Sequence, residues 1–165
     1  MINKMLTFEV TVFGYESNMK VLIDCGASAN YARRKTVSLN ADLYATACDK
    51  CRSNEDISVK MADGSVTVVP KIQINLKFKF LDFDCEDTFF VLDLDQRYDL
   101  ILGMTWLERN QPWIDWVNKT MGRTEPAPEF HHYSALESHV PSTMVSDPIK
   151  AICWHIAKIE LLPAP

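Results

Sequence analysis

The chain has 165 residues and a formal net charge of −5, and 47% of its residues are hydrophobic. This composition is typical of one globular domain with a buried core and some additional chain. The negative charge argues against direct binding to nucleic acid, because binding to phosphates normally needs a basic surface. The sequence shows no secretory signal and no apolar run of membrane-spanning length. We therefore expect no membrane association and a cytoplasmic location, with five cysteines that are free thiols.

The first half of the chain predicts short strands separated by turns. Alternating apolar residues predict a strand over residues 5–13, and an apolar run predicts a second over residues 19–23. Residues 31–39 are expected to form a short helix, and the polar stretch 48–56 a loop. An Asp-Gly pair stands between two alternating segments, which predicts a hairpin over residues 57–69.

The second half continues this pattern as far as residue 116. Residues 72–80 alternate over nine positions, and two further strands are expected at 88–94 and 98–103. A short helix over 104–110 and a closing strand over 112–116 follow. The expected fold is all-β and barrel-like over residues 1–118. Residues 119–165 are expected to be an irregular linker or tail, with a short helix or strand near its end.

The stretch from Lys20 to Tyr31, KVLIDCGASANY, carries the sharpest chemical candidate. Asp24 ends an apolar strand, and Gly26 and small residues follow it. A carboxylate at such a turn is open to close approach by a substrate, although Asp24 at this position could equally just end a strand. Two facing carboxylates can share a proton and then activate water for amide hydrolysis.

Three blocks taken together resemble a known family. They are VLIDCGASANY, the hairpin VKMADGSV and the later block YDLILGMTWLERNQPWIDW, in this order along the chain. The sequence resembles the retropepsin-type aspartic protease of the Pol polyprotein of gypsy-type retrotransposons. The resemblance implies an acid-protease barrel with one lobe per chain and one or two short helices, followed by the irregular tail.

The resemblance also implies a role for individual residues. Asp24 matches the catalytic aspartate. The residues that match the support of the catalytic turn are Cys25, Gly26, Ala27, Ser28, Ile101, Leu102 and Gly103. The residues that match the tip of the flap, the hairpin that closes over bound peptide, are Met61, Ala62, Asp63, Gly64 and Ser65. No cofactor and no metal ion are implied.

The chain has a single Asp-x-Gly turn of this kind, so a facing carboxylate requires a second copy. We therefore expect a homodimer that acts as an aspartic endopeptidase on extended polyprotein segments. The alternative is a catalytically degenerate module of the same fold that serves dimerisation or peptide binding. A third possibility is a cellular protease domesticated from such an element. The tail would lead towards an absent reverse transcriptase domain, and the cytoplasmic location would include the particles of the element.

The cysteines leave two further alternatives. Cys25 stands where most retropepsins have Ser or Thr, and a thiol is the weaker hydrogen-bond donor, which implies a weaker dimer. Cys25 as a thiol nucleophile would need a base, and all four histidines lie in the tail. Cys48 and Cys51 have the spacing of half a zinc site, but the sequence offers no second half, so loop cysteines without metal are favoured.

Overall fold

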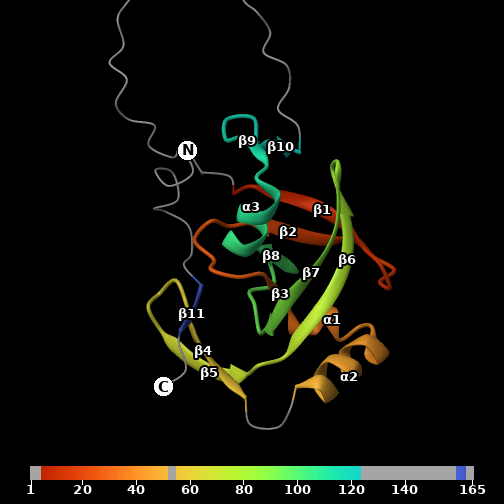
Figure 1. Ribbon diagram of the computed structural model, residues 1–165, viewed down its shortest axis with the longest axis vertical. Helices are drawn as coiled ribbons and strands as arrows, with labels where there is room; N and C mark the ends of the chain where they lie inside the picture. The colour runs from red at the N-terminus through yellow and green to blue at the C-terminus, as the bar shows by residue number, and fades with distance from the viewer. Residues whose placement is uncertain (1–4, 52–54, 124–158, 163–165) are drawn as a thin grey trace, which may run out of the picture.

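The computed structural model describes residues 5–51, 55–123 and 159–162. Six strands form a closed barrel in the order β1-β2-β8-β3-β7-β6 (Figure 1). These strands are β1 (Thr7–Val12), β2 (Met19–Ile23), β3 (Tyr31–Arg33), β6 (Gln73–Phe80), β7 (Phe83–Leu92) and β8 (Leu100–Leu102). The expected fold class, a mostly-β barrel with few short helices, is confirmed.

The remaining elements lie around this barrel. A three-stranded sheet has the order β11-β4-β5, and β10 pairs with β9. Their bounds are β4 (Asp56–Lys60), β5 (Val66–Pro70), β9 (Trp113–Asp115), β10 (Thr120–Gly122) and β11 (Glu160–Leu162). The helices are α1 (Arg34–Val37), α2 (Ala41–Lys50) and α3 (Met104–Asn110). None of the described helices is long and apolar enough to cross a membrane.

The main core fills the barrel. Along β6 every second residue is buried, which is the alternation expected when one face of a strand lines a core. Within this core three aromatic rings form a group: Phe80 stacks on Phe83, and both contact the fully buried Trp106 of α3. These ring contacts attach α3 to the barrel, so the helix has a fixed position relative to the strand ends.

A second apolar cluster lies on the other face of β2, β3 and β8. We call it the outer cluster; its buried members are Leu22, Ala27, Ala29, Tyr31, Val59, Leu92, Ile101 and Ile159. Ile101 pairs with Leu22 on one side and with Tyr31 on the other, so these three side chains form one row. Val59 comes from β4 and Ile159 precedes β11. The outer cluster therefore joins the barrel to the three-stranded sheet.

Two sequence-based expectations about local structure were wrong in part, although α1 (Arg34–Val37) does lie within the helix expected over residues 31–39. Residues 31–33 form strand β3 instead of a helix, because they pair in parallel with β7 and antiparallel with β8. Tertiary pairing here outweighs a weak helix pattern. Residues 48–50 belong to α2 instead of a loop, and the Asn40 side chain accepts a hydrogen bond from the Leu43 N–H at 3.1 Å. Asn is a favoured residue at that capping position.

Two short strands, β10 and β11, lie within residues 119–165, which were expected to be irregular apart from a short helix or strand near the end. β10 pairs with β9 and β11 pairs with β4. Residues 124–158, which include most of the predicted linker, lie outside the described residues. The predicted domain boundary at residue 118 stays a prediction.

Candidate active site

Asp24 lies directly after β2 and is fully buried, with 0% of its surface exposed. Its backbone N–H donates to the Leu102 carbonyl oxygen at 3.0 Å, and its Oδ1 accepts from the Gly26 N–H at 2.8 Å. Among the described residues, its other oxygen, Oδ2, has no hydrogen-bond partner. Burial raises the pKa of Asp24 from 3.8 to about 6, although the Gly26 hydrogen bond acts in the opposite direction. The turn thus holds a carboxylic acid that can exchange a proton under mildly acidic conditions.

The turn after Asp24 is held by the junction between β8 and α3. The Met104 N–H donates to the Ala27 carbonyl oxygen at 2.8 Å. A Cβ atom at Gly103 would lie 2.2 Å from the Ala29 carbonyl oxygen and 2.5 Å from that of Ala27. Only glycine allows the two backbone segments to approach this closely. The glycine predicted to support the turn is therefore in direct contact with it.

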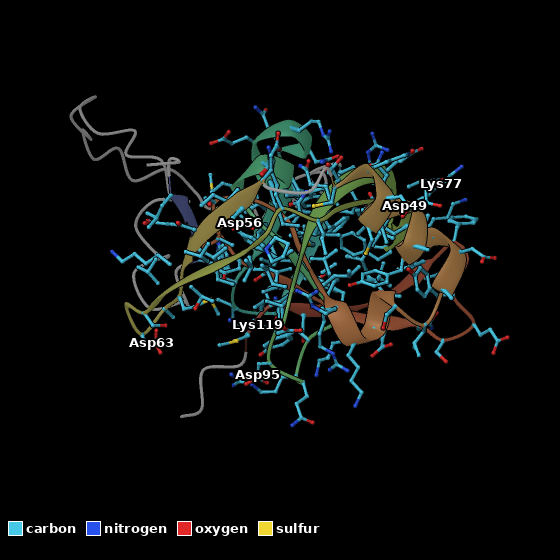
Figure 2. All side chains as sticks on the ribbon, turned by 90° about the horizontal axis from the view of Figure 1, so that it is seen from below. Asp49, Asp56, Asp63, Lys77, Asp95 and Lys119 are labelled. Carbon is cyan, nitrogen blue, oxygen red and sulfur yellow. The ribbon has the colours of Figure 1, made fainter. Side chains whose placement is uncertain are left out.

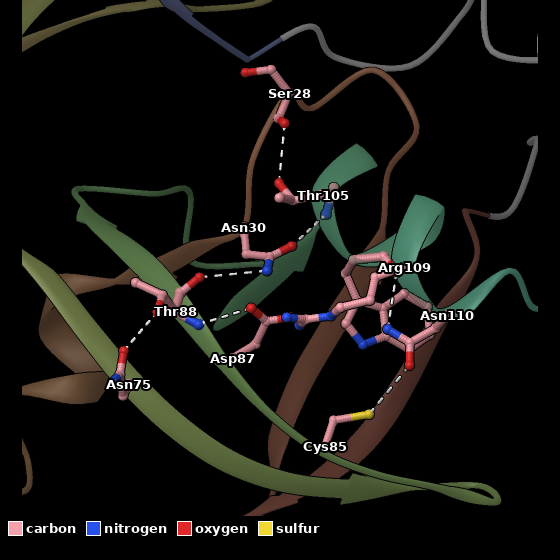
Figure 3. Close-up of polar contacts among 11 residues, drawn as sticks. Ser28, Asn30, Asn75, Cys85, Asp87, Thr88, Thr105, Arg109 and Asn110 are labelled. Atoms are coloured by element: carbon pink, nitrogen blue, oxygen red, sulfur yellow. Dashed lines mark hydrogen bonds and ion pairs between the residues drawn. The ribbon is translucent and has the colours of Figure 1, made fainter.

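Polar side chains brace the same turn from two further directions (Figure 3). Asn30 is buried, and its Oδ1 accepts from the Gly103 N–H at 3.1 Å while its Nδ2 donates to the Thr88 carbonyl oxygen at 3.4 Å. The Thr105 hydroxyl donates to the Ser28 carbonyl oxygen at 3.2 Å. Asn30 thus joins the turn to α3 and β7, and Thr105 adds a second contact from α3.

Ser28 contacts a segment from the far end of the chain. Its N–H donates to the Ile159 carbonyl oxygen at 2.9 Å, and its Oγ accepts from the Leu161 N–H at 3.1 Å. The Ser28 Oγ also lies 3.3 Å from the hydroxyl of the buried Tyr31. A parallel bridge pairs Ala27 with Ile159. The turn after Asp24 is therefore one wall of a surface on which the segment around Ile159 lies.

The predicted flap is the β4–β5 hairpin. Gly64 has a φ of +84°, and its N–H donates to the Met61 carbonyl oxygen at 2.9 Å, which closes the predicted Asp-Gly turn. Met61 packs against the outer cluster, whereas residues 62–65 are exposed. In Figure 2, Asp63 lies at the far end of the hairpin. The structure thus brings Met61, but not residues 62–65, into contact with the outer cluster.

Ile101 and Leu102 face opposite sides of the sheet. Leu102 belongs to the main core, and its carbonyl oxygen accepts from the Asp24 N–H. Ile101 belongs to the outer cluster together with Val59 and Ile159. Leu102 is thus placed to support the turn from behind, and Ile101 lies on the same side as the strand seated on Ser28.

The cysteines differ from one another. Cys48, Cys51 and Cys85 are free thiols, whereas Cys25 is disulfide-bonded, which corrects the expectation that all five thiols are free. No group of three or more His, Cys, Asp or Glu side chains suited to a metal ion occurs among the described residues. The four histidines and Cys153 lie outside those residues.

Sequence reasoning missed four contributors to this site: Asn30, Tyr31, Thr105 and Ile159. Asn30 and Tyr31 belong to the block KVLIDCGASANY. The available signal for Asn30 was a polar residue between the small Ala29 and the aromatic Tyr31. The part played by Ile159 had no local signal, because it depends on a contact across 131 residues.

Comparison with known proteins places this geometry in a family. Residues 20–130 match the family described as the PEG10/RTL1 protease domain. Among solved structures, the chain is similar to the retroviral protease-like domain of Ddi1 from Leishmania major, at 21% identity and a TM-score of 0.50. That match covers 72% of this chain and 89% of the Ddi1 chain, and it indicates a shared fold. No curated protein matches the chain.

Proposed function

The chain belongs to the PEG10/RTL1 protease domain family, which is retropepsin-like, and on that premise we propose that it is an aspartic endopeptidase. The observation that carries the proposal is Asp24, a buried carboxyl with a pKa near 6 at the tip of β2. A pKa in this range suits a group that must both take up and release a proton. The Leu102 carbonyl oxygen holds the Asp24 backbone in place, and the Gly26 N–H orients the carboxyl through its Oδ1.

The active species we propose is a homodimer in which two Asp24 side chains face each other across a twofold axis. Two carboxylates at close range share one proton, because both cannot ionise together. The ionised Asp24 removes a proton from water, and the water oxygen attacks the scissile carbonyl carbon while the protonated Asp24 gives its proton to the carbonyl oxygen. Proton transfer to the amide nitrogen then breaks the carbon–nitrogen bond and releases two peptides.

The substrate we propose is an extended peptide segment of a polyprotein. Such a segment can add to a strand edge through backbone hydrogen bonds and place alternate side chains in apolar contacts. β4 and the exposed Ser28 supply the backbone partners, and the outer cluster supplies the apolar surface. An origin in a gypsy-type retrotransposon and an intracellular location complete the proposal.

Cleavage of a fluorogenic peptide with apolar residues on both sides of the scissile bond tests the proposal. We expect a bell-shaped pH profile on the acidic side that disappears in Asp24→Asn, while the control variant Asp49→Asn, at an exposed residue of α2, keeps it. Dilution should abolish cleavage in parallel with dissociation of the dimer in sedimentation experiments. Cleavage that survives Asp24→Asn would exclude the aspartic mechanism.

Two alternatives give different results in the same assay. A degenerate binding module would bind the peptide without cleaving it at any pH. A thiol mechanism at Cys25 would be lost in Cys25→Ser, whereas the aspartic mechanism survives that change. The Cys25→Ser comparison is made with a thiol reductant present, because the disulfide of Cys25 would otherwise differ between the two proteins.

A further inference from the structure

The segment Ile159–Leu162 lies as an extended strand between β4 and the catalytic turn. Its β11 portion pairs antiparallel with β4, with Leu161 opposite Val59 (Figure 1). On its other side, the Ile159 carbonyl oxygen accepts from the Ser28 N–H at 2.9 Å, and the Leu161 N–H donates to the Ser28 Oγ at 3.1 Å. Backbone groups on both edges of the segment are therefore bonded to the site.

Apolar contacts hold the same segment against the sheet. Ile159 is 4% exposed and packs within the outer cluster, and Leu161 packs against that cluster. The two side chains are two positions apart, so they lie on one face of an extended chain. The surface thus holds a peptide with aliphatic residues at alternate positions.

These are the groups that an extended substrate would need in the function proposed above. A peptide bound beside Asp24 would use three groups of contacts. These are the edge of β4 that is not paired with β5, the N–H and Oγ of Ser28, and the apolar surface around Ile101. The segment occupies all three, and in this state Asp24 has 0% of its surface exposed. Peptide and segment cannot bind there together.

We propose that the Ile159–Leu162 segment is an intramolecular inhibitor that competes with peptide substrate for this surface. The competition with substrate depends on the proposed function; the occupancy of the surface by the segment does not. Release of the segment from β4 and Ser28 is then the step that opens the site.

Hydrogen exchange of the 165-residue chain tests the occupancy without any need for catalysis. Ile159→Asp places a charge in the outer cluster, and we expect exchange at the Ser28 N–H to rise by on the order of tenfold or more, as loss of one buried aliphatic side chain predicts. Leu161→Pro removes the donor to the Ser28 Oγ and should act in the same direction. Val117→Asp is the matched control, because Val117 is 88% exposed, and it should leave Ser28 unchanged. All samples contain a thiol reductant, so that Cys25 has one redox state throughout.

Peptide cleavage tests the competition. We expect Ile159→Asp to raise kcat/KM on the fluorogenic peptide by about tenfold. This matches the expected rise in Ser28 N–H exchange, because both report the fraction of molecules in which the segment has left the surface. A synthetic peptide of residues 157–164, added to Ile159→Asp, should raise KM with kcat unchanged and restore protection of the Ser28 N–H. The same peptide with Asp in place of Ile159 should do neither.

Three results would overturn the proposal. They are unchanged Ser28 exchange in both segment variants, cleavage by Ile159→Asp that is no faster than wild type, and Ser28 protection in the wild type that falls on dilution. The last result would show that a second copy supplies the segment. If no protein cleaves the peptide but Ser28 exchange rises as expected, the proposed protease function fails while the occupancy of the surface stands.

Discussion

Replacing Asp24 by Asn should stabilise the fold at pH 8 while it removes catalysis. The pKa of Asp24 is raised from 3.8 to about 6 in the folded chain, so the protonated carboxyl favours folding and the ionised one opposes it. The stability that the proton provides is fully present below about pH 4 and is lost as the pH rises through about 6. A difference of roughly two pKa units corresponds to about 3 kcal/mol.

Asn has the shape of the protonated carboxyl and no charge to bury. Its Oδ1 can keep the hydrogen bond from the Gly26 N–H, which is 2.8 Å long in the wild type. We therefore expect Asp24→Asn to match the wild type to within about 1 kcal/mol at pH 4 and to exceed its free energy of unfolding by about 2–3 kcal/mol at pH 8.

Urea denaturation at pH 4 and pH 8 measures this difference, at a protein concentration low enough to keep both proteins monomeric. Asp63→Asn is the control, because the pKa of the exposed Asp63 is lowered by hydrogen bonds from Ser65 and its loss should bring no gain at pH 8. An equal effect of Asp24→Asn at the two pH values would refute the reasoning, since burial of the charge would then cost nothing.

Four further substitutions test how the turn after Asp24 and its surroundings are held, each read as the free energy of unfolding in urea. Gly103→Ala forces a Cβ to within 2.2 Å of the Ala29 carbonyl oxygen and should cost about 2–4 kcal/mol. Gly64→Ala, where a Cβ meets nothing within 4 Å but φ is +84°, should cost only about 1 kcal/mol; equal losses at the two glycines would contradict the close approach. Asn30→Ala leaves the buried Gly103 N–H without its acceptor, so we expect a loss of about 1–3 kcal/mol and slower peptide cleavage; unchanged kcat would show that the brace is dispensable. Trp106→Ala empties a fully buried site among aromatic rings and should cost about 3–5 kcal/mol, with a loss below 1 kcal/mol contradicting the packing.

Periodic segments were the part of the fold that the sequence predicted well. The alternation over residues 72–80 became β6 and the Trp-Leu segment became α3, because in both cases the pattern of apolar residues matches the face that is buried. β3 could not be predicted in this way, since three residues carry no measurable period and their conformation is decided by pairing with β7 and β8. Its neighbour α2 had a usable signal in its Asn40 cap.

The parts of the candidate site formed by residues close together in the sequence could be predicted. The contacts between residues far apart in the sequence could not. Asp24, Gly26 and the hairpin around Gly64 each combine a turn residue with a flanking strand, and this combination is visible in a few letters of sequence. Ser28 was predicted from the same block, but its contacts with Ile159 and Leu161 had no signal, because these partners lie more than a hundred residues away along the chain. The burial that raises the pKa of Asp24 is likewise a property of packing around the turn.

The three residues of β8 also determine how many residues the turn between Ile23 and Tyr31 can contain. Ile101 pairs with Leu22 before the turn and with Tyr31 after it, so both ends of the turn are in register with the same strand. One inserted residue would move Tyr31 to the opposite face of the sheet or break one of the two pairings. The exposed loop at residues 62–65 has no such constraint. Natural variation in chain length among relatives should therefore accumulate in the hairpin and be absent between Ile23 and Tyr31.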